Sequence, residues 1–160
     1  MNQLFYKPRD AWAADFIPFY HDGRFRLFYL HDWRDAAGYG EGTPWFQVST
    51  DDFIQYAEHG EMLPRGSVEE QDLYVFTGSV IEAGGRFHIF YTGHNPHFRR
   101  QGRPEQAVMH AVSDDLLHWR KLPEDTFFAP EAGYEPHDWR DPFVFWNEGP
   151  ASTGCCWPRG

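Results

Sequence analysis

The fold is decided by the stretch Gly-Arg-Phe-Arg-Leu-Phe-Tyr at residues 23–29, which recurs 62 positions later as Gly-Arg-Phe-His-Ile-Phe-Tyr at residues 85–91. A second motif, at residues 48–56, recurs at residues 112–119, and both copies carry aspartates and end in an aromatic side chain. The two motifs occur in the same order in each copy. Together they indicate an internal repeat of 62–63 residues.

Each copy of the repeat is typical of short strands joined by turns. The apolar run at residues 16–20 leads through the turn His-Asp-Gly at residues 21–23 into a second apolar run at residues 25–30, which predicts a hairpin. The glycines at 84 and 85 repeat that turn in the second copy. A polar loop, a third strand (residues 45–49 and 107–113) and a fourth strand follow in each copy. No window shows a helical period of useful length.

Four short strands in a repeat of this length predict a blade of a β-propeller. A β-sandwich has similar strand spacing, but it does not require internal copies. The chain contains two blades and the start of a third. We therefore predict an all-β partial propeller of about two and a half blades of four-stranded antiparallel sheet, which is too few to close a ring of roughly four to eight blades.

We divide the chain into a propeller part, residues 1–148, and an aberrant tail, residues 149–160. The tail reads Gly-Pro-Ala-Ser-Thr-Gly-Cys-Cys-Trp-Pro-Arg-Gly and has no strand pattern, although a hairpin partner for residues 143–146 is due there. When residues 150–160 are back-translated and read one nucleotide earlier, the triplets force Leu-Leu-Ala in the middle, as an apolar strand requires. The hypothesis is that the tail is a frameshift product of a truncated enzyme; the alternative is a natural irregular tail.

Resequencing the locus tests the frameshift hypothesis. We expect the alternative reading frame to continue into further propeller-like coding sequence. An unbroken frame that ends at Gly160, with no propeller coding downstream, would contradict it.

Composition excludes some partners and leaves others open. Aromatic residues make up 19% of the chain; they suit strands and also stack on sugars. The net charge of −10 argues against nucleic acid and anionic membranes, because the only basic cluster is formed by Arg99, Arg100 and Arg103. We expect a carbohydrate partner, and the sequence makes no prediction of oligomeric state.

The termini give an expectation about location and redox chemistry. The N-terminus has no apolar run of signal-peptide length and no stretch is long enough to span a bilayer, so a cytoplasmic location is expected. The adjacent Cys155 and Cys156 cannot cross-link the fold and match no zinc or redox spacing.

Two aspartates head equivalent segments. Asp15 opens Asp-Phe-Ile-Pro-Phe-Tyr and Asp141 opens Asp-Pro-Phe-Val-Phe-Trp, two periods later; the segment Thr-Gly-Ser at residues 77–79 has the same place in the second copy. Because the first strand of each blade lies nearest the propeller axis, these acids are expected to converge at one mouth. Paired carboxylates there suit glycoside hydrolysis, with one as nucleophile or base and one as acid. A turn-capping role remains the alternative for each acid.

At these residues the chain resembles glycoside hydrolase family 32, the β-fructofuranosidases, invertases and levanases. Residues 76–80, Phe-Thr-Gly-Ser-Val, resemble the family's Phe-Ser-Gly-Ser motif, and residues 137–142 contain its Arg-Asp-Pro motif. Residues 52–56 and 115–119 resemble a blade signature shared with the related family 43. The resemblance runs from about Trp12 to Trp146.

The resemblance implies a five-bladed propeller and a retaining double displacement on β-fructofuranosides such as sucrose or fructan. It implies Asp15 as nucleophile, Asp141 as transition-state stabiliser, Arg140 as the residue that orients Asp141, and Phe76 and Ser79 as pocket residues. The usual Asn-Asp-Pro-Asn is replaced by Ala-Asp-Phe-Ile at residues 14–17. The family's general acid, a Glu in a Glu-Cys motif of the next blade, is expected beyond residue 160, so this chain alone is expected to be inactive.

The remaining candidates are aromatic and histidine side chains. Trp33, Trp45 and Trp139 are candidates for stacking on sugar rings, with simple packing as the alternative. His94 and His97 lack a third ligand with supporting spacing, so neither a metal nor a cofactor is expected.

Two other functions stay open on the sequence. One is a family 43-type inverting arabinofuranosidase or xylosidase, in which Asp15 is a general base and the carboxyls lie about 6.5–9.5 Å apart. The other is a non-catalytic carbohydrate-binding propeller fragment.

Overall fold

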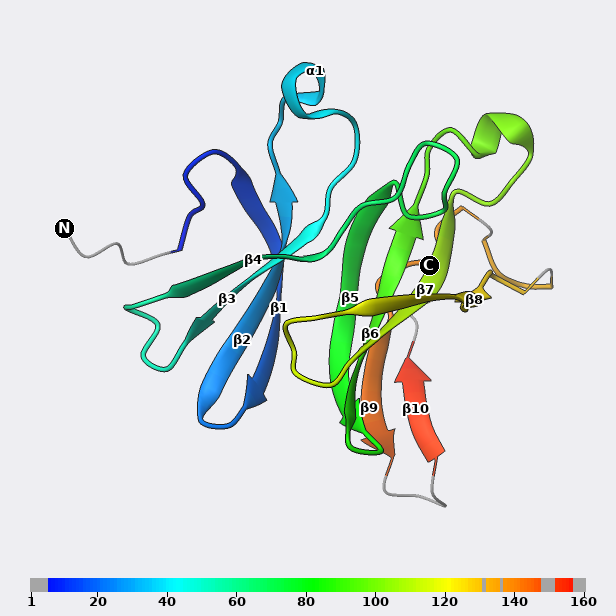
Figure 1. Cartoon of the computed structure of the whole chain (residues 1–160). Helices are drawn as coiled ribbons and strands as arrows, with labels where there is room; N and C mark the ends of the chain where they lie inside the picture. Colours follow the sequence, from blue (N-terminus) through cyan, green and yellow to red (C-terminus); the bar gives the residue numbers. More distant parts are fainter. Residues whose placement is uncertain (1–5, 131, 136, 148–151, 157–160) are drawn as a thin grey trace.

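The computed structural model describes residues 6–130, 132–135, 137–147 and 152–156 and is almost entirely β-structure (Figure 1). The exceptions are the short helix α1 (Ala36–Tyr39) and a 3₁₀ turn, η1 (Arg99–Gln101). Within the described ranges, no helix is long and apolar enough to cross a membrane.

The strands form three antiparallel sheets that follow the chain order. The first sheet has the order β1-β2-β3-β4 and the second β5-β6-β7-β8, while β9 and β10 form a two-stranded sheet. Their bounds are β1 (Trp12–His21), β2 (Arg24–Asp32), β3 (Trp45–Thr50), β4 (Ala57–Leu63), β5 (Tyr74–Ala83), β6 (Arg86–His94), β7 (Gln106–Ser113), β8 (Arg120–Phe127), β9 (Phe143–Asn147) and β10 (Ser152–Cys156). The predicted all-β partial propeller of two and a half blades is confirmed.

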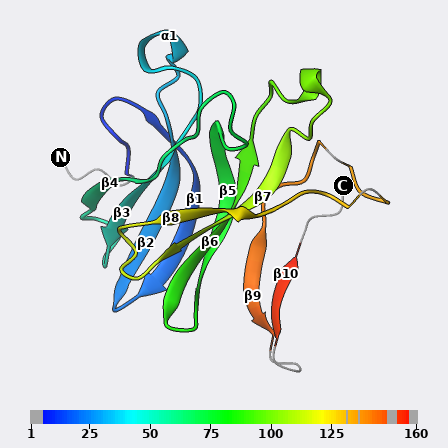
Figure 2. The same ribbon diagram turned by 45° about the vertical axis from the view of Figure 1, so that its right-hand side comes forward.

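The first strand of each sheet faces the centre of the arrangement. Strand β5 contacts both β1 and β9, so the inner strands of consecutive blades are neighbours. Figures 1 and 2 show the three sheets side by side, with the loop that carries α1 and the loop that carries η1 at the same end. The segments that lead into β5 and β9 also reach this end.

The main core fills the space between the first two blades. Alternation along β2 sends Phe28 and Leu30 to one face, where they pack with β5 and β6 side chains such as Ile89 and Tyr91. The ring of Trp45 is fully buried in this core. In this structure Trp45 therefore has no exposed ring face on which a sugar could stack, and the alternative of simple packing describes its position.

The opposite face of β2 forms a second, smaller core. Leu27 and Tyr29 pack with Val48 and with the ring of Tyr6 from the N-terminal segment. Leu27 and Tyr29 occupy the repeat positions that Ile89 and Tyr91 occupy in the second blade. The first blade therefore keeps a docking face like the one by which the second blade packs on its neighbour.

The repeated aspartate motif is a turn between the third and fourth strands. Thr50 Oγ1 accepts the N–H three positions later, and Asp52 Oδ1 accepts the N–H groups two and three positions later. Ser113 and Asp115 make the same bonds in the second blade. These aspartates are structural, because their side chains replace backbone partners within the turn.

One expectation about the tail was wrong. Residues 152–156 showed no strand pattern in the sequence, yet they form β10, paired with β9 so that Thr153 lies opposite Trp146. Ladder hydrogen bonds come from the backbone. An unpaired edge strand can therefore pair with a segment whose side chains do not alternate. The division at residue 148 and the frameshift remain predictions.

Gly78 generates a prediction about stability. A Cβ at this position of β5 would lie 2.0 Å from Phe90 O, a backbone atom of the paired strand, so β5 and β6 would have to separate. We expect Gly78→Ala to lower the free energy of unfolding in urea by about 2–4 kcal/mol. The matched control is Gly84→Asn, where φ is +60° and no atom lies within 4 Å. Equal small losses for both variants would contradict this account.

Candidate functional site

The candidate site is built on one irregularity that recurs in the inner strands. The β1–β2 register shifts between Ala14 and Ile17, so that Asp15 lies in a bulge with φ of 47°. The β5–β6 register shifts between Phe76 and Gly78, which places Thr77 in the equivalent bulge. Asp141, just before β9, has φ of 56°. Aspartate tolerates positive φ, and a bulge turns its side chain away from the sheet alternation.

Hydrogen bonds from the second blade connect these positions. The Thr77 hydroxyl donates to Asp15 Oδ2 at 2.7 Å. The backbone N–H of Asp141 donates to Thr92 Oγ1 at 2.8 Å, and the Thr92 hydroxyl donates to the Thr77 carbonyl at 3.1 Å. The structure therefore links both predicted acids through two threonines of one blade.

The two acids also interact electrostatically. Burial raises the pKa of the Asp141 carboxyl, the Arg140 guanidinium acts in the opposite direction, and the Asp15 carboxylate adds to the increase. Arg140 Nε lies 3.9 Å from Asp141 Oδ2, and Arg140 Nη2 lies 3.6 Å from Asp138 Oδ1. The carboxyls of Asp15 and Asp141 thus lie at the same end of the inner strands, close enough to affect each other.

The other predicted pocket residues divide between the site and the packing around it. The Phe76 ring stacks on His94 with centroids 4.8 Å apart. Ser79 is buried, and its hydroxyl accepts the Val144 N–H at 3.0 Å, so that it joins β5 to β9. Trp139 is buried and packs edge-on to Tyr134.

Trp33 lies in the loop between β2 and β3. Its ring stacks on Tyr39 with centroids 5.2 Å apart, and the Arg65 guanidinium lies 5.2 Å from its centroid. Arg65 also donates to backbone carbonyls of this loop, including that of Gly42 at 3.0 Å. Trp33 is partly exposed, unlike Trp45 and Trp139.

A polar contact joins the loops of the first two blades at the same end. Glu41 Oε1 accepts the Tyr74 hydroxyl at 3.2 Å, and Glu41 Oε2 lies 2.9 Å from His97 Nε2. His97 thereby takes part in a hydrogen bond between loops. Among the described residues, no group of three or more His, Cys, Asp and Glu side chains could hold a metal ion.

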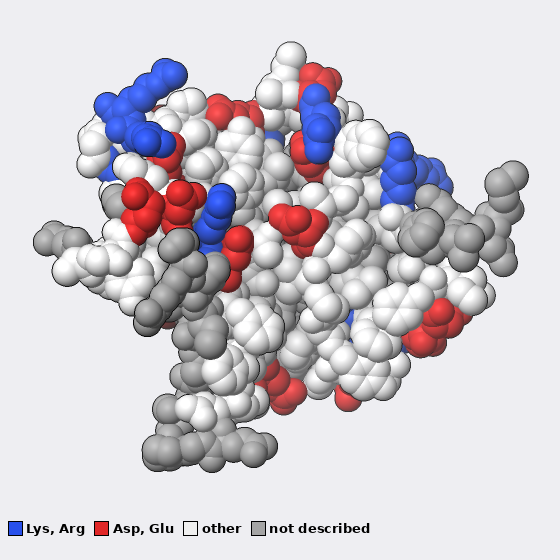
Figure 3. Space-filling model, turned by 180° about the vertical axis from the view of Figure 1, so that it is seen from behind, with Lys and Arg blue, Asp and Glu red and all other residues white. Residues whose placement is uncertain are grey.

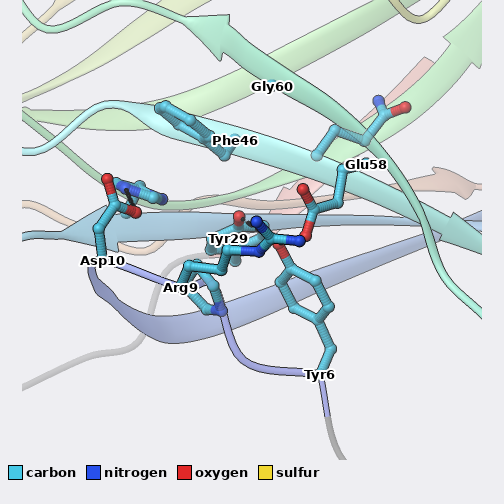
Figure 4. A pocket seen from close by; sticks show the side chains of 10 residues that line it. Tyr6, Arg9, Asp10, Tyr29, Phe46, Glu58 and Gly60 are labelled. Carbon is cyan, nitrogen blue, oxygen red and sulfur yellow. Dashed lines mark hydrogen bonds and ion pairs between the residues drawn. The ribbon is translucent and has the colours of Figure 1, made fainter.

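A separate cavity of about 320 Å³ lies on the face of the first blade that carries the smaller core, the face turned away from the second blade (Figure 4). The Tyr6 hydroxyl lies 3.0 Å from the Tyr29 hydroxyl and donates to Glu58 at 3.2 Å within its wall. Burial raises the pKa of Tyr29, so both phenols stay neutral. Neither Asp15 nor Asp141 lines this cavity.

Charge is mixed over the surface. On the face opposite to the view of Figure 1, basic and acidic side chains lie next to one another in the upper part and uncharged side chains fill the middle (Figure 3). The basic side chains seen on this face form separate groups along its upper part, the largest of them at the upper left. The field near the acids is therefore set by close groups such as Arg140 rather than by a large region of one sign.

Sequence reasoning identified both acids but missed Thr92. The position of Thr77 was visible because it lies one period after Asp15. Thr92 has no such signal, because its contact with Asp141 depends on how the third sheet packs on the second.

Two neighbouring carboxyls at one end of the inner strands of a propeller are the kind of arrangement that glycoside hydrolysis uses. The profile of the glycosyl hydrolases family 32 N-terminal domain matches residues 6–154. The chain therefore belongs to glycosyl hydrolase family 32, and the resemblance read from the motifs is confirmed.

Individual relatives agree with this assignment. The chain is 32% identical over 148 residues to acid β-fructofuranosidase of Solanum lycopersicum, an alignment that covers 89% of this chain and 22% of the relative. Its fold is similar to that of β-fructofuranosidase from Schwanniomyces occidentalis complexed with fructosyl-erythritol, with a TM-score of 0.73, 18% identity, and coverage of 97% of this chain and 31% of the other. The chain thus spans less than a third of either relative.

A family 43 enzyme is a more distant neighbour. The β-xylosidase/α-arabinofuranosidase from a compost microbial metagenome gives a TM-score of 0.61 at 13% identity, covering 92% of this chain and 43% of the other. At this identity the similarity concerns the fold alone.

The electrostatic coupling can be tested by titration. We expect Asp15→Asn to lower the pKa of Asp141, because a nearby negative charge is removed, and Arg140→Gln to raise it further, because a positive charge is removed. The carboxyl ¹³C shift of Asp141 against pH measures both changes. Glu124→Gln, an exposed acid on β8, is the control and should leave it unchanged. An Asp141 titration insensitive to Asp15→Asn would refute the convergence of the two acids.

Proposed function

We propose that this chain carries the nucleophile half of a β-fructofuranosidase site that acts by a retaining double displacement. Asp15 is the nucleophile, and Asp141 stabilises the oxocarbenium-like transition state, with Arg140 orienting it. The observation that carries the proposal is the pair of interacting carboxyls, joined through Thr77 and Thr92, in a family 32 chain. The wider family supports a carbohydrate substrate.

The contacts of Asp15 suit nucleophilic attack. Thr77 donates to Oδ2, and among the described residues no hydrogen bond reaches Oδ1. One oxygen is thus held while the other is free to form a bond to the anomeric carbon of the sugar. As that bond forms, the bond to the leaving oxygen breaks and its electron pair departs with that oxygen. Water then attacks the same anomeric carbon and gives a proton to the conjugate base of the proton donor, while the bond from that carbon to Asp15 breaks and its electron pair returns to the carboxylate.

Asp141 and Arg140 provide the charge for this step. The raised pKa of Asp141 reflects its partial burial and the nearby Asp15. When positive charge develops on the sugar ring, the ionised form of the Asp141 carboxyl becomes more favourable than it is in the free protein. Its stabilising effect is therefore larger in the transition state than in the ground state. Phe76, stacked on His94, would supply an apolar wall.

We further propose that the proton donor is not among these 160 residues. The family resemblance points to a glutamate of a following blade, and the chain spans only about a fifth of the tomato relative. Natural fructosides, whose leaving alkoxide requires protonation, would then not be turned over by this chain alone.

The proposal predicts covalent labelling by a substrate that needs no proton donor. An aryl β-D-fructofuranoside with a nitrophenolate leaving group should add the mass of one fructosyl residue to the chain, and peptide mapping should place it on Asp15. We expect Asp15→Asn to reduce the labelling rate by more than about a thousandfold. Asp22→Asn, an exposed aspartate of the same hairpin with φ of 48°, is the matched control and should label normally.

Other outcomes of this experiment would support the two alternative functions. Absence of any adduct, with fructose still bound, favours a non-catalytic sugar-binding fragment. Hydrolysis of an aryl α-L-arabinofuranoside with inversion, followed by NMR of the first product anomer, favours the family 43-type mechanism. Either result would overturn the retaining assignment.

A further inference from the structure

We infer that Thr77 and Thr92 are positioning residues that hold the two carboxyls of the site at a fixed separation. The inference rests on the proposed function for its chemical meaning. The linkage itself rests on three hydrogen bonds that run from the Asp15 carboxylate through Thr77 and Thr92 to the Asp141 backbone. These bonds run from the first sheet, through the second, to the segment that leads into β9.

The hydroxyl of Thr92 has only one possible arrangement in this network. Thr92 lies on β6, opposite Phe76, and is fully buried. A hydroxyl has a single hydrogen, and here it is donated to the Thr77 carbonyl. The oxygen is then left to accept the Asp141 N–H, which it does at 2.8 Å. Valine has the same shape but can make neither bond.

The bulge in β5 explains why Thr77 needs this partner. Phe76 pairs with Thr92 and Gly78 pairs with Tyr91, so Thr77 between them has no partner in the ladder. Its carbonyl is satisfied by the Thr92 hydroxyl instead. Its own side chain is turned toward the first blade, where it donates to Asp15 Oδ2.

The two threonines therefore act on different acids, Thr77 from the bulge in β5 and Thr92 from the neighbouring strand β6. Thr77 fixes the carboxylate of Asp15 directly, whereas Thr92 fixes the backbone of Asp141 and makes no bond to its carboxyl. Threonine is suited to this task because its β-branched side chain is restricted about χ1. Attack on the anomeric carbon and stabilisation of the charge on the ring require the two acids to lie at set positions around one sugar, so the pair of threonines fixes a geometry on which the proposed reaction depends.

The test for Thr92 uses amide hydrogen exchange in the 160-residue chain. Thr92→Val should accelerate exchange of the Asp141 N–H by about tenfold or more, because its acceptor is lost. Thr92→Ser, which keeps the hydroxyl, should retain most of the protection. The amide of Ile89 in the middle of β6 reports whether the sheet is intact, and Thr126→Val on β8 is a control variant that should change neither amide.

The test for Thr77 uses the titration of Asp141. We expect Thr77→Val to lower the pKa of Asp141, but by less than Asp15→Asn does, because a released Asp15 carboxylate spends less time near Asp141. Thr77→Ser should restore the original value. In the labelling reaction, Thr77→Val should slow formation of the Asp15 adduct by about 10–100-fold at saturating substrate, since misplacing a reacting group has effects of this size.

These readouts separate the inference from the proposed function. If Asp141 exchange is unchanged in Thr92→Val, or its titration is unchanged in Thr77→Val, while Ile89 stays protected, the positioning role is refuted. If both NMR readouts respond but the unaltered chain forms no adduct, the positioning role stands and the proposed function fails.

Discussion

The arrangement of this chain depends on the hydrogen bonds that β5 and β6 make to the strands on either side of them. Thr77 contacts the first blade, and Thr92 and Ser79 contact the segment that begins the third. Apolar packing brings the blades together, but it is not directional and would tolerate sliding. The polar contacts are directional, so they fix how far each inner strand is displaced along its neighbour.

The fold was predictable because its signal is local and repeated. The apolar runs within 23–29 and 85–91 indicate strands buried on both faces, and the turn motifs around Asp52 and Asp115 mark the ends of the third strands. Each copy confirms the interpretation of the other, which a single stretch could not do. The same periodicity placed Asp15 and Asp141 at equivalent points, although Asp15 lies in the first sheet and Asp141 just before the third.

The parts that could not be predicted depend on strand register, on packing between blades and on backbone pairing. A one-residue bulge at Thr77 reverses which side of β5 later residues face, so the contact of Ser79 with the β9 backbone could not be read from the sequence. Trp45 was a sugar-stacking candidate because of its type, but burial between two blades is decided by their packing. Strand β10 was missed because backbone pairing with β9, rather than side-chain pattern, produces it.

The bulges have an evolutionary consequence. A residue outside the ladder contributes little to sheet pairing, so its side chain can change without loss of the strand. The first blade has aspartate there, the second threonine, and the segment before the third again aspartate. Duplication of one blade therefore supplies several equivalent sites at one end of the axis, and each copy can diverge into acid, donor or support while the scaffold remains the same.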